Sequence, residues 1–324
     1  MSGFIKKFQN RVFHKRIFER KSGIIIGVSG GPDSVCLLTI FSLLKDKYQL
    51  KLKVCHVNYG LRGKYSDGDE NFVKKLAMKS NLEFSGVKFF QKNNSKQNLE
   101  ESMREFRYDF FEKERQKSGF DYIAVGHNLD DRVETFFLNL LRGTGSGGLV
   151  SLREKNNKVI RPLLIFSRKE ILEFLESQKQ KYRVDQTNQD EKYTRNRIRK
   201  VLIPLLEKKF NPKLKKRISD LEDNLLVANL AEKEYSKLLM KKVDWKNLSF
   251  DLVKMSKLND WQKQLVLRQA CRETKGNLRN FSRAHIFELE KVLRGYKSID
   301  KEIFIGGLRA RISKGRVQFS NQQT

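Results

Sequence analysis

The sequence predicts an α/β fold: a parallel sheet with helices on both faces, followed by a smaller, mainly helical C-terminal domain that ends in a β-hairpin. Three observations predict it. From residue 24 to about 165, short apolar runs alternate with helical patterns, which is typical of a parallel sheet. After about residue 215 the pattern changes to long charged helices, and the chain closes on alternating residues around a Gly-Gly pair. We therefore place the domains at residues 1–215 and 216–324.

The sheet is expected to contain five strands, each a short apolar run bounded by turn residues. They are IIIGV (24–28), LKVCHV (52–57), LEFSGVKF (82–89), DYIAVG (121–126) and KVIRPL (158–163). Helices are expected between them at residues 33–46, 67–79, 98–117 and 129–142. Side chains that can accept a backbone N–H predict helix starts at Ser66, Asn128 and Ser167, the last with Glu170 as a capping box.

The chain carries 67 Lys and Arg against 38 Asp and Glu, a formal net charge of +29. This charge favours a polyanionic partner, because each phosphate that a protein neutralises releases counterions. An ordinary solvated basic surface is the alternative. The basic excess is dense before the domain boundary, where residues 190–220 contain 11 Lys and Arg against 4 Asp and Glu.

The three cysteines are widely spaced and odd in number, which excludes a disulfide framework and a Cys-x-x-Cys zinc or redox site. This usage fits a reducing compartment. The N-terminal residues lack the apolar core of a signal peptide, and no run reaches the roughly 18 apolar residues of a membrane span. We therefore expect a cytoplasmic protein that does not bind a membrane.

The run SGGPDS (29–34) joins the first apolar strand to the next helix. Consecutive backbone N–H groups at a helix N-terminus form an anion site. Gly30 and Gly31 allow a sharp turn and a close approach to a ligand, and Ser29 and Ser34 add hydroxyl donors. The run lacks the lysine of a Walker loop and the spacing of a Gly-x-Gly-x-x-Gly turn.

This run resembles the Ser-Gly-Gly-x-Asp-Ser loop of the PP-loop ATP-pyrophosphatase superfamily. The resemblance implies a nucleotide-binding domain that cleaves ATP between the α and β phosphates and transfers AMP to a substrate oxygen. Asp33 then becomes intelligible as a partner of Mg²⁺ or as an orienting group, since Mg²⁺ commonly bridges carboxylates and phosphates. The implied cofactors are ATP and Mg²⁺.

Further motifs follow in order and together resemble the tRNA(Ile)-lysidine synthetase family over residues 24–204. They are HVNYGLR (56–62), ESMREFRYDFF (101–111), AVGHNLDDRVET (124–135), LLRGTGSGGL (140–149), RPLL (161–164) and DQTNQDEKYTRNRIRKVLIP (185–204). The chain departs from the family at Tyr59 and Asn128, where the family usually has histidine.

The resemblance implies the site residues. As catalytic residues it implies Asp33, His127 and Asp131; for ATP, Ser29, Gly30, Gly31, Asp33, Ser34, His56, Asn58 and Gly126; and for the metal, Asp131. For tRNA binding the candidates are Arg195, Asn196 and Arg199, since the two arginines bracket Asn196 in RNRIR and could bind phosphate or tRNA. Asp131 would hold the incoming amine or Mg²⁺, and His127 would lie by the reactive phosphate. The segments after the second and fourth strands also lie where open parallel sheets bind ligands. The alternatives are a helix-dipole role for the aspartates and a solvated face for the arginines.

The implied reaction converts the wobble cytidine of tRNA(Ile) with a CAU anticodon to lysidine. ATP adenylates the carbonyl oxygen at carbon 2, L-lysine attacks that carbon, and AMP and pyrophosphate leave. Residues 1–215 would form the catalytic domain and residues 216–324 a tRNA-binding domain, in a chain that could pair as a homodimer.

Three other classes of function are alternatives to the one that the resemblance implies. A PP-loop tRNA thiolase usually needs catalytic cysteines or an iron–sulfur cluster, and the chain has no Cys-x-x-Cys pair. An amide-forming enzyme of small metabolites would not need so basic a surface. A non-catalytic RNA-binding module leaves SGGPDS and GHNLDD unexplained.

Overall fold

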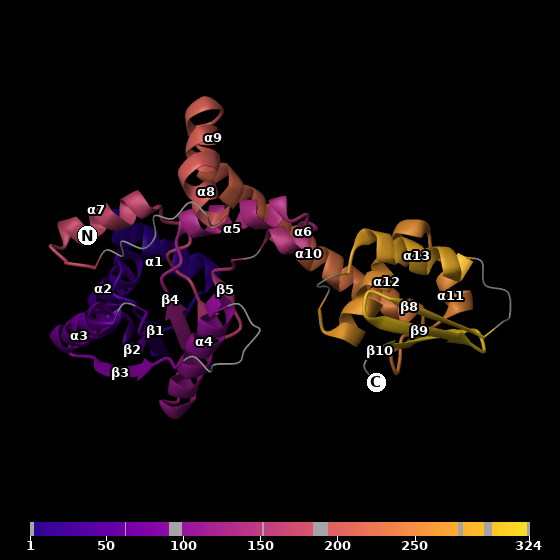
Figure 1. Ribbon diagram of the computed structural model, residues 1–324, viewed down its shortest axis with the longest axis horizontal. Coiled ribbons are helices and arrows are strands. Elements are labelled where there is room, and N and C mark those ends of the chain that lie inside the picture. Colours follow the sequence, from indigo (N-terminus) through magenta and orange to yellow (C-terminus); the bar gives the residue numbers. More distant parts are fainter. Residues whose placement is uncertain are drawn as a thin grey trace. The chain divides into compact units, whose positions relative to one another are not determined.

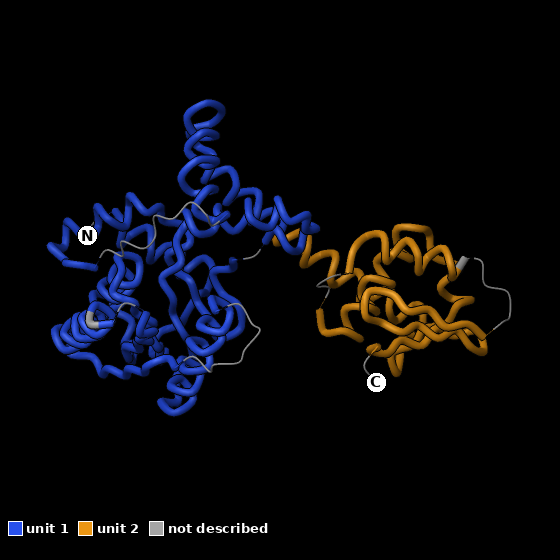
Figure 2. The backbone as a smooth tube through the Cα atoms, viewed as in Figure 1, with its two compact units in different colours: residues 1–225 blue, residues 226–324 orange. Residues whose placement is uncertain are grey.

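The computed structural model describes residues 3–61, 63–90, 99–150, 152–183, 194–277, 281–294 and 300–322. The chain forms two compact units, Met1–Leu225 and Leu226–Thr324 (Figure 2). The division lies inside the long helix α10 (Leu214–Lys242), whereas the sequence places a domain boundary just after that helix begins.

The first unit alternates strands and helices as expected. Its elements are α1 (Gly3–Lys15), β1 (Gly23–Gly27), α2 (Pro32–Tyr48), β2 (Lys51–Asn58), α3 (Lys64–Lys79), β3 (Glu83–Lys88), α4 (Leu99–Lys117), β4 (Tyr122–Val125), α5 (Leu129–Leu141), α6 (Ser146–Leu149), β5 (Lys155–Asn156), β6 (Val159–Ile160), α7 (Arg168–Ser177), α8 (Thr194–Arg197), the π-helical turn η2 (Ile198–Leu202), α9 (Ile203–Lys209) and the first part of α10. All five predicted strands are present, although the fifth is only two residues long.

These strands form one sheet in the order β3-β2-β1-β4-β6-β5, in which only β5 is antiparallel (Figure 1). Alternate residues of each strand point to opposite faces. Ile24 and Ile26 join the core that contains residues of α1, α2, α3 and α7, whereas Ile25 packs with Phe111 of α4. Both faces of the sheet are therefore buried, as a parallel sheet requires.

Two of the three predicted helix starts are confirmed. The side chains of Asn128 and Ser167 each accept the backbone N–H three residues later, within complete capping boxes at α5 and α7. The prediction for Ser66 is wrong, because α3 begins at Lys64 after Gly63, so Ser66 lies inside the helix.

The second unit has its own sheet and core. Besides the end of α10 it contains β7 (Ser249–Asp251), α11 (Leu252–Ser256), α12 (Asp260–Lys275), α13 (Arg283–Arg294), β8 (Lys301–Ile305), β9 (Leu308–Ser313) and β10 (Arg316–Asn321). The terminal hairpin that the sequence predicts is confirmed, and it belongs to an antiparallel sheet in the order β7-β10-β9-β8. Residues of α10, α12 and α13 pack on this sheet.

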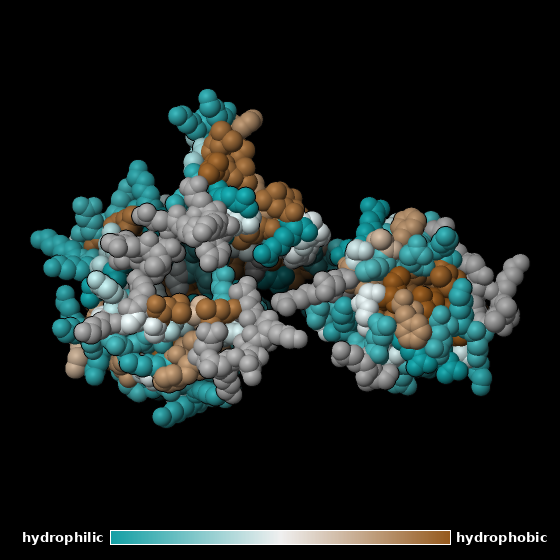
Figure 3. Space-filling view, viewed as in Figure 1, coloured by the Kyte–Doolittle hydropathy of each residue, from teal (hydrophilic) through white to brown (hydrophobic). Residues whose placement is uncertain are grey.

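The visible surface is polar over much of its area, with hydrophobic side chains gathered near α9 (Figure 3). Val201, Leu205 and Phe210 are among the exposed apolar residues of that segment. They lie outside because η2 and α9 pack through Ile198 and Ile203 against α5 and α10. Within the described ranges, no helix combines the length and the apolar character needed to cross a membrane.

Candidate active site

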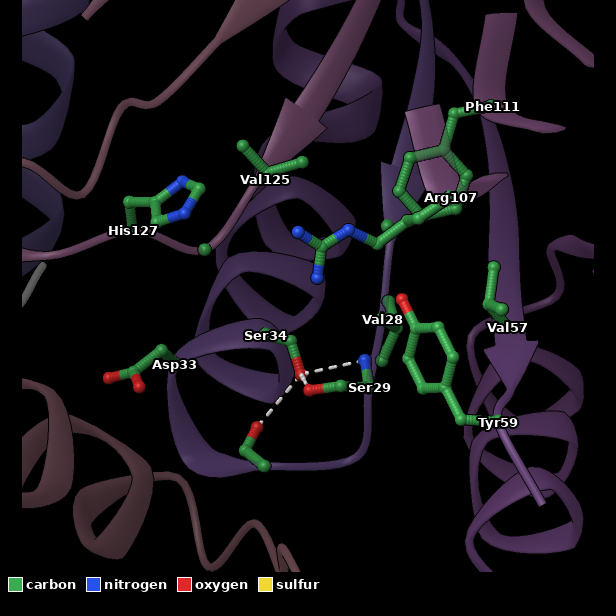
Figure 4. Close-up of a pocket in the computed structure, with 13 residues that line it drawn as sticks. Val28, Ser29, Asp33, Ser34, Val57, Tyr59, Arg107, Phe111, Val125 and His127 are labelled. Atoms are coloured by element: carbon green, nitrogen blue, oxygen red, sulfur yellow. Dashed lines mark hydrogen bonds between the residues drawn. The ribbon is translucent and has the colours of Figure 1, made fainter. Parts of the chain in front are cut away.

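A pocket opens at the carboxyl ends of β1, β2 and β4 (Figure 4). β1 lies between β2 and β4, so the chain leaves β1 toward one neighbour and later returns beside the other. Such a switch point is where open α/β sheets bind ligands. The pocket is lined by Gly27, Val28, Ser29, Gly31, Asp33, Ser34, Val57, Tyr59, Arg107, Phe111, Val125, Gly126 and His127.

The loop between β1 and α2 is held by its own serine hydroxyls. Ser34 Oγ accepts the Ser29 backbone N–H at 3.1 Å, lies 3.1 Å from Ser29 Oγ and donates to the Gly31 carbonyl at 2.9 Å (Figure 4). Gly30 has a φ of +94°, a backbone conformation that strongly favours glycine. The first N–H groups of α2, which have no partner within a helix, are thereby presented at the pocket as an anion site.

Gly126 packs directly against this loop. A Cβ at residue 126 would lie 2.9 Å from the Asp33 carbonyl carbon and 2.9 Å from the Ser34 nitrogen. Both are backbone atoms, which cannot move aside as a flexible side chain can. Glycine is thus required for β4 and the loop to approach each other, whatever ligand the pocket holds.

Asp33 is the carboxylate that lines the pocket. Its Oδ1 accepts a hydrogen bond from Asn128 Nδ2 at 2.9 Å, and its Oδ2 is paired with the Arg168 guanidinium. Burial raises the pKa of Asp33, and the charge of Arg168 and the hydrogen bond from Asn128 oppose that rise. The ionised carboxylate therefore depends on these two partners.

His127 faces the same pocket from the end of β4 and is neutral. Burial and, to a smaller extent, the charges of four arginines together lower its pKa to about 3; these are Arg161, Arg107, Arg195 and Arg104. Its Nδ1 is buried without a hydrogen-bond partner among the described residues. Near His127, Arg107 presents its guanidinium to the pocket from α4 (Figure 4). This wall of the pocket suits a negatively charged ligand.

Asp131 and Glu134 lie one turn apart on α5 and share two arginines. Arg195 and Arg199 both pair with Glu134, whose side chain is only 1% exposed, and Arg195 also approaches Asp131 at 3.4 Å. Burial is the largest of the effects that raise the pKa of Asp131 to about 6, and the charges of Glu134 and Asp33 act in the same direction. The hydrogen bond from the Asn128 backbone N–H and the charge of Arg195 oppose the rise. Asp131 and Glu134 are not among the lining residues of the pocket, but the charges of Glu134 and Asp33 both act on Asp131.

The structure does not bring every predicted residue into the pocket. His56 is buried with Nδ1 2.8 Å from the Val28 carbonyl, and the Asn58 amide donates to Asp67 and Glu70. Gly30 also lies outside the lining residues, and its carbonyl accepts the backbone N–H of Arg183. Arg195, Asn196 and Arg199 lie on α8 and η2, next to α5.

Three side chains that sequence reasoning did not single out contribute to the site, together with Tyr59, which it named only as a departure from the family. Tyr59, Arg107 and Phe111 line the pocket, and Arg168 pairs with Asp33. Arg107 and Phe111 belong to the ESMREFRYDFF motif, which was a usable signal. Arg168 follows the cap residue Ser167, and its 135-residue separation from Asp33 leaves no local pattern to find.

The carboxylates fit Mg²⁺ in chemistry, because this ion prefers oxygen ligands and usually binds one or two carboxylates together with substrate phosphates. Asp33 lines the pocket and also raises the pKa of Asp131, so a cation near both would relieve their repulsion. Within the described part of the chain, no group of three or more His, Cys, Asp or Glu side chains is arranged to hold a metal unaided. Substrate phosphates would have to complete such a site.

Comparison with known proteins gives a consistent result. The model of the PP-loop domain family matches residues 3–206. The tRNA(Ile)-lysidine synthase of Clostridium tetani is 33% identical over 296 residues, covering 88% of this chain and 62% of the relative. That of Chlorobaculum tepidum is 38% identical over 212 residues, which is 64% of each chain. The chain thus spans less than two thirds of the length of these relatives.

Among solved structures, the U34-tRNA thiolase NcsA from Methanococcus maripaludis has a similar fold. It superposes with a TM-score of 0.57 at 21% identity, covering 69% of this chain and 78% of the thiolase chain. At this identity the likeness concerns the fold alone.

Proposed function

Because the chain belongs to the PP-loop domain family, we propose that it is a tRNA(Ile)-lysidine synthase. It would use ATP and Mg²⁺ to join L-lysine to carbon 2 of the wobble cytidine of tRNA(Ile) with a CAU anticodon. One observation carries the proposal: the SGGPDS loop, Arg107 of the ESMREFRYDFF motif and His127 of the GHNLDD motif line one pocket. Motifs far apart in the sequence thus converge on one site.

In the first step, the cytidine carbonyl oxygen attacks the α-phosphorus of ATP, and pyrophosphate leaves with the electrons of the broken P–O bond. The loop N–H groups would bind the pyrophosphate, and the hydroxyls of Ser29 and Ser34 would turn toward it from their partners within the loop. Arg107 would stabilise charge on the reacting phosphate, beside neutral His127. Bound Mg²⁺, held by Asp33 with Asp131 near it, would neutralise further phosphate charge.

In the second step, the amine of L-lysine attacks carbon 2, AMP leaves with the former carbonyl oxygen, and the amine loses a proton. Asp131 is the proposed group that orients this amine. Its pKa of about 6 makes it a better proton acceptor than an ordinary aspartate, yet leaves it ionised at neutral pH. Arg195 and Arg199 would hold α8 and η2 against α5 through their ion pairs with Glu134. Asn196, which lies between them in the sequence, would contact tRNA.

The second unit is proposed to hold tRNA. Residues 226–324 contain 21 Lys and Arg against 10 Asp and Glu, so this unit is basic in its own right. Binding of this kind neutralises phosphates and weakens with added salt. Function in the cytoplasm and pairing of two chains stay predictions.

A tRNA thiolase is the alternative, and the cysteines oppose it. Cys36, Cys55 and Cys271 are all buried, and burial raises the pKa of each thiol, that of Cys55 and Cys271 to about 12. None of the three lines the pocket. A thiol must be accessible and ionised to carry sulfur.

The direct test incubates the protein with tRNA(Ile) bearing a CAU anticodon, ATP, Mg²⁺ and labelled lysine. We expect label in the tRNA and one AMP released per lysine joined. The same tRNA with guanosine at the wobble position serves as control and should take up no label. A folded protein that joins no lysine to the CAU tRNA would refute the proposal, and sulfur incorporation would favour the thiolase.

Arg168→Ala should move the acidic limb of the pH profile of AMP release to higher pH. The Arg168 charge lowers the pKa of Asp33, so without it the carboxylate becomes protonated at a higher pH. The measurement is kcat/KM for ATP as a function of pH. Lys169→Ala is the matched control, because its side chain is 86% exposed and pairs with Glu173. An unchanged acidic limb in Arg168→Ala would contradict the need for an ionised Asp33.

A further inference from the structure

A buried guanidinium joins α5 to α10. Arg132, the residue after Asp131, is only 3% exposed. Its Nε donates to Glu222 Oε2 at 2.8 Å, one Nη donates to Ser219 Oγ at 2.7 Å and the other donates to Asp223 Oδ1 at 2.7 Å. The three partners are spaced by three and four residues, so they lie on one face of α10.

A second ion pair supports the same turn of α5. Lys215, one turn before Ser219 on α10, binds Asp130 Oδ1 at 2.8 Å. The other carboxylate oxygen of Asp130 accepts the backbone N–H of Arg168 at 2.7 Å. Two residues in the first turn of α5, Asp130 and Arg132, are therefore bound to α10.

This turn of α5 carries groups of the candidate active site. Its cap residue Asn128 donates to Asp33, and the Asn128 and Asp131 side chains each accept the other's backbone N–H at 3.0 Å. The position of the turn thus determines where Asn128 meets Asp33. Arg132 itself does not line the pocket.

We propose that Arg132 is a positioning residue. It fixes the first turn of α5 against α10 and so keeps the side chains of Asn128 and Asp131 in their positions relative to Asp33. A buried ion pair adds little stability over apolar packing, since desolvation offsets its attraction. The three hydrogen bonds of the Arg132 guanidinium do fix the orientation of α5 relative to α10, because the guanidinium group is planar and its N–H groups point in fixed directions. The structural claim stands alone, and its kinetic consequence rests on the proposed function.

Arg132→Lys tests the inference, because it keeps the charge and loses the fork. Arg11→Lys is the matched control. Arg11 donates twice to Glu154 and once to Asp223, at 3.1 Å, so its substitution disturbs the same carboxylate without touching α5. If Arg132→Lys does not fold, Glu222→Gln keeps the guanidinium and the shape of its partner, and the same changes are expected at smaller size.

The first readout is amide hydrogen exchange, which needs no substrate. In Arg132→Lys we expect exchange at the backbone amides of residues 131 and 132 to rise about tenfold while α2 and α12 keep their protection, because the loss of a local contact promotes local opening. Arg11→Lys should leave the α5 amides unchanged. Unchanged protection of α5 in Arg132→Lys, or equal loss in Arg11→Lys, overturns the proposal.

The second readout is the kinetics of AMP release well below the melting temperature. We expect kcat of Arg132→Lys to fall about 30-fold with KM for ATP within about threefold, since a misplacement of ~1 Å can cost roughly 100-fold in rate. A purely stabilising role would lower the melting temperature and leave kcat of the folded protein intact, which would overturn the proposal. A wild-type protein that joins no lysine refutes the proposed function instead, and hydrogen exchange still decides the role of Arg132.

Discussion

Asp33→Ala should nearly abolish AMP release, by at least about 100-fold in kcat, since removing one group that stabilises charge in a transition state costs 100- to 1,000-fold. Asp33 is the carboxylate that lines the pocket. It accepts a hydrogen bond from Asn128 and forms an ion pair with Arg168. Its loss removes the proposed Mg²⁺ ligand and leaves the Arg168 charge without its partner. Binding of tRNA should be nearly intact, as measured by filter binding at fixed salt.

Asp46→Ala is the control for that variant. Asp46 lies on the same helix, α2, at its exposed far end, so the substitution tests whether any loss of a carboxylate from this helix matters. Its turnover should equal that of the wild type. Normal turnover by Asp33→Ala would remove Asp33 from the catalytic assignment.

Gly126→Ala should weaken ATP binding about 10- to 100-fold and destabilise the first unit by about 1–3 kcal/mol, the usual cost of forcing an extra methyl group into a packed site. The added Cβ would press on the backbone of Asp33 and Ser34, so either the end of β4 or the anion-binding loop must shift. Calorimetric titration with a non-hydrolysable ATP analogue and thermal unfolding measure the two effects.

Gly3→Ala provides the same chemical change in open space, because no atom lies within 4 Å of a Cβ built there. Its ATP affinity should match the wild type. If Gly126→Ala binds ATP with wild-type affinity, the close approach of β4 is not what shapes the loop.

The features that could be predicted from the sequence are those encoded locally. The loop at Ser29–Ser34 and the capping box at Asn128 involve residues up to five positions apart, so their geometry follows from adjacent residue types. The helix start predicted at Ser66 was wrong, because α3 already begins at Lys64 after the cap residue Gly63.

Positions in β2 show why the implied ligand residues needed the structure. Side chains alternate along a strand, so Val57 lines the pocket while His56 and Asn58 point to the other face and bond to Val28, Asp67 and Glu70. A motif in the sequence fixes which residues are close to the site but does not say which face each side chain occupies.

Contacts across long sequence separations were beyond sequence reasoning for a different reason. Arg132 meets Glu222 across 90 residues, and Arg199 meets Glu134 across 65. Arginines in a basic chain look alike in sequence, and only the packing of α5 against η2 and α10 decides which of them is paired.

The burial of the cysteines has a practical consequence. Cys36 lies on α2 two residues after Ser34, Cys55 lies in β2, and Cys271 lies on α12 of the second unit. An alkylating reagent reaches such thiols only when the surrounding structure opens. The rate at which these thiols are alkylated therefore measures local opening of the native protein without an introduced label. Cys36 and Cys55 report on the first unit, and Cys271 reports on the second.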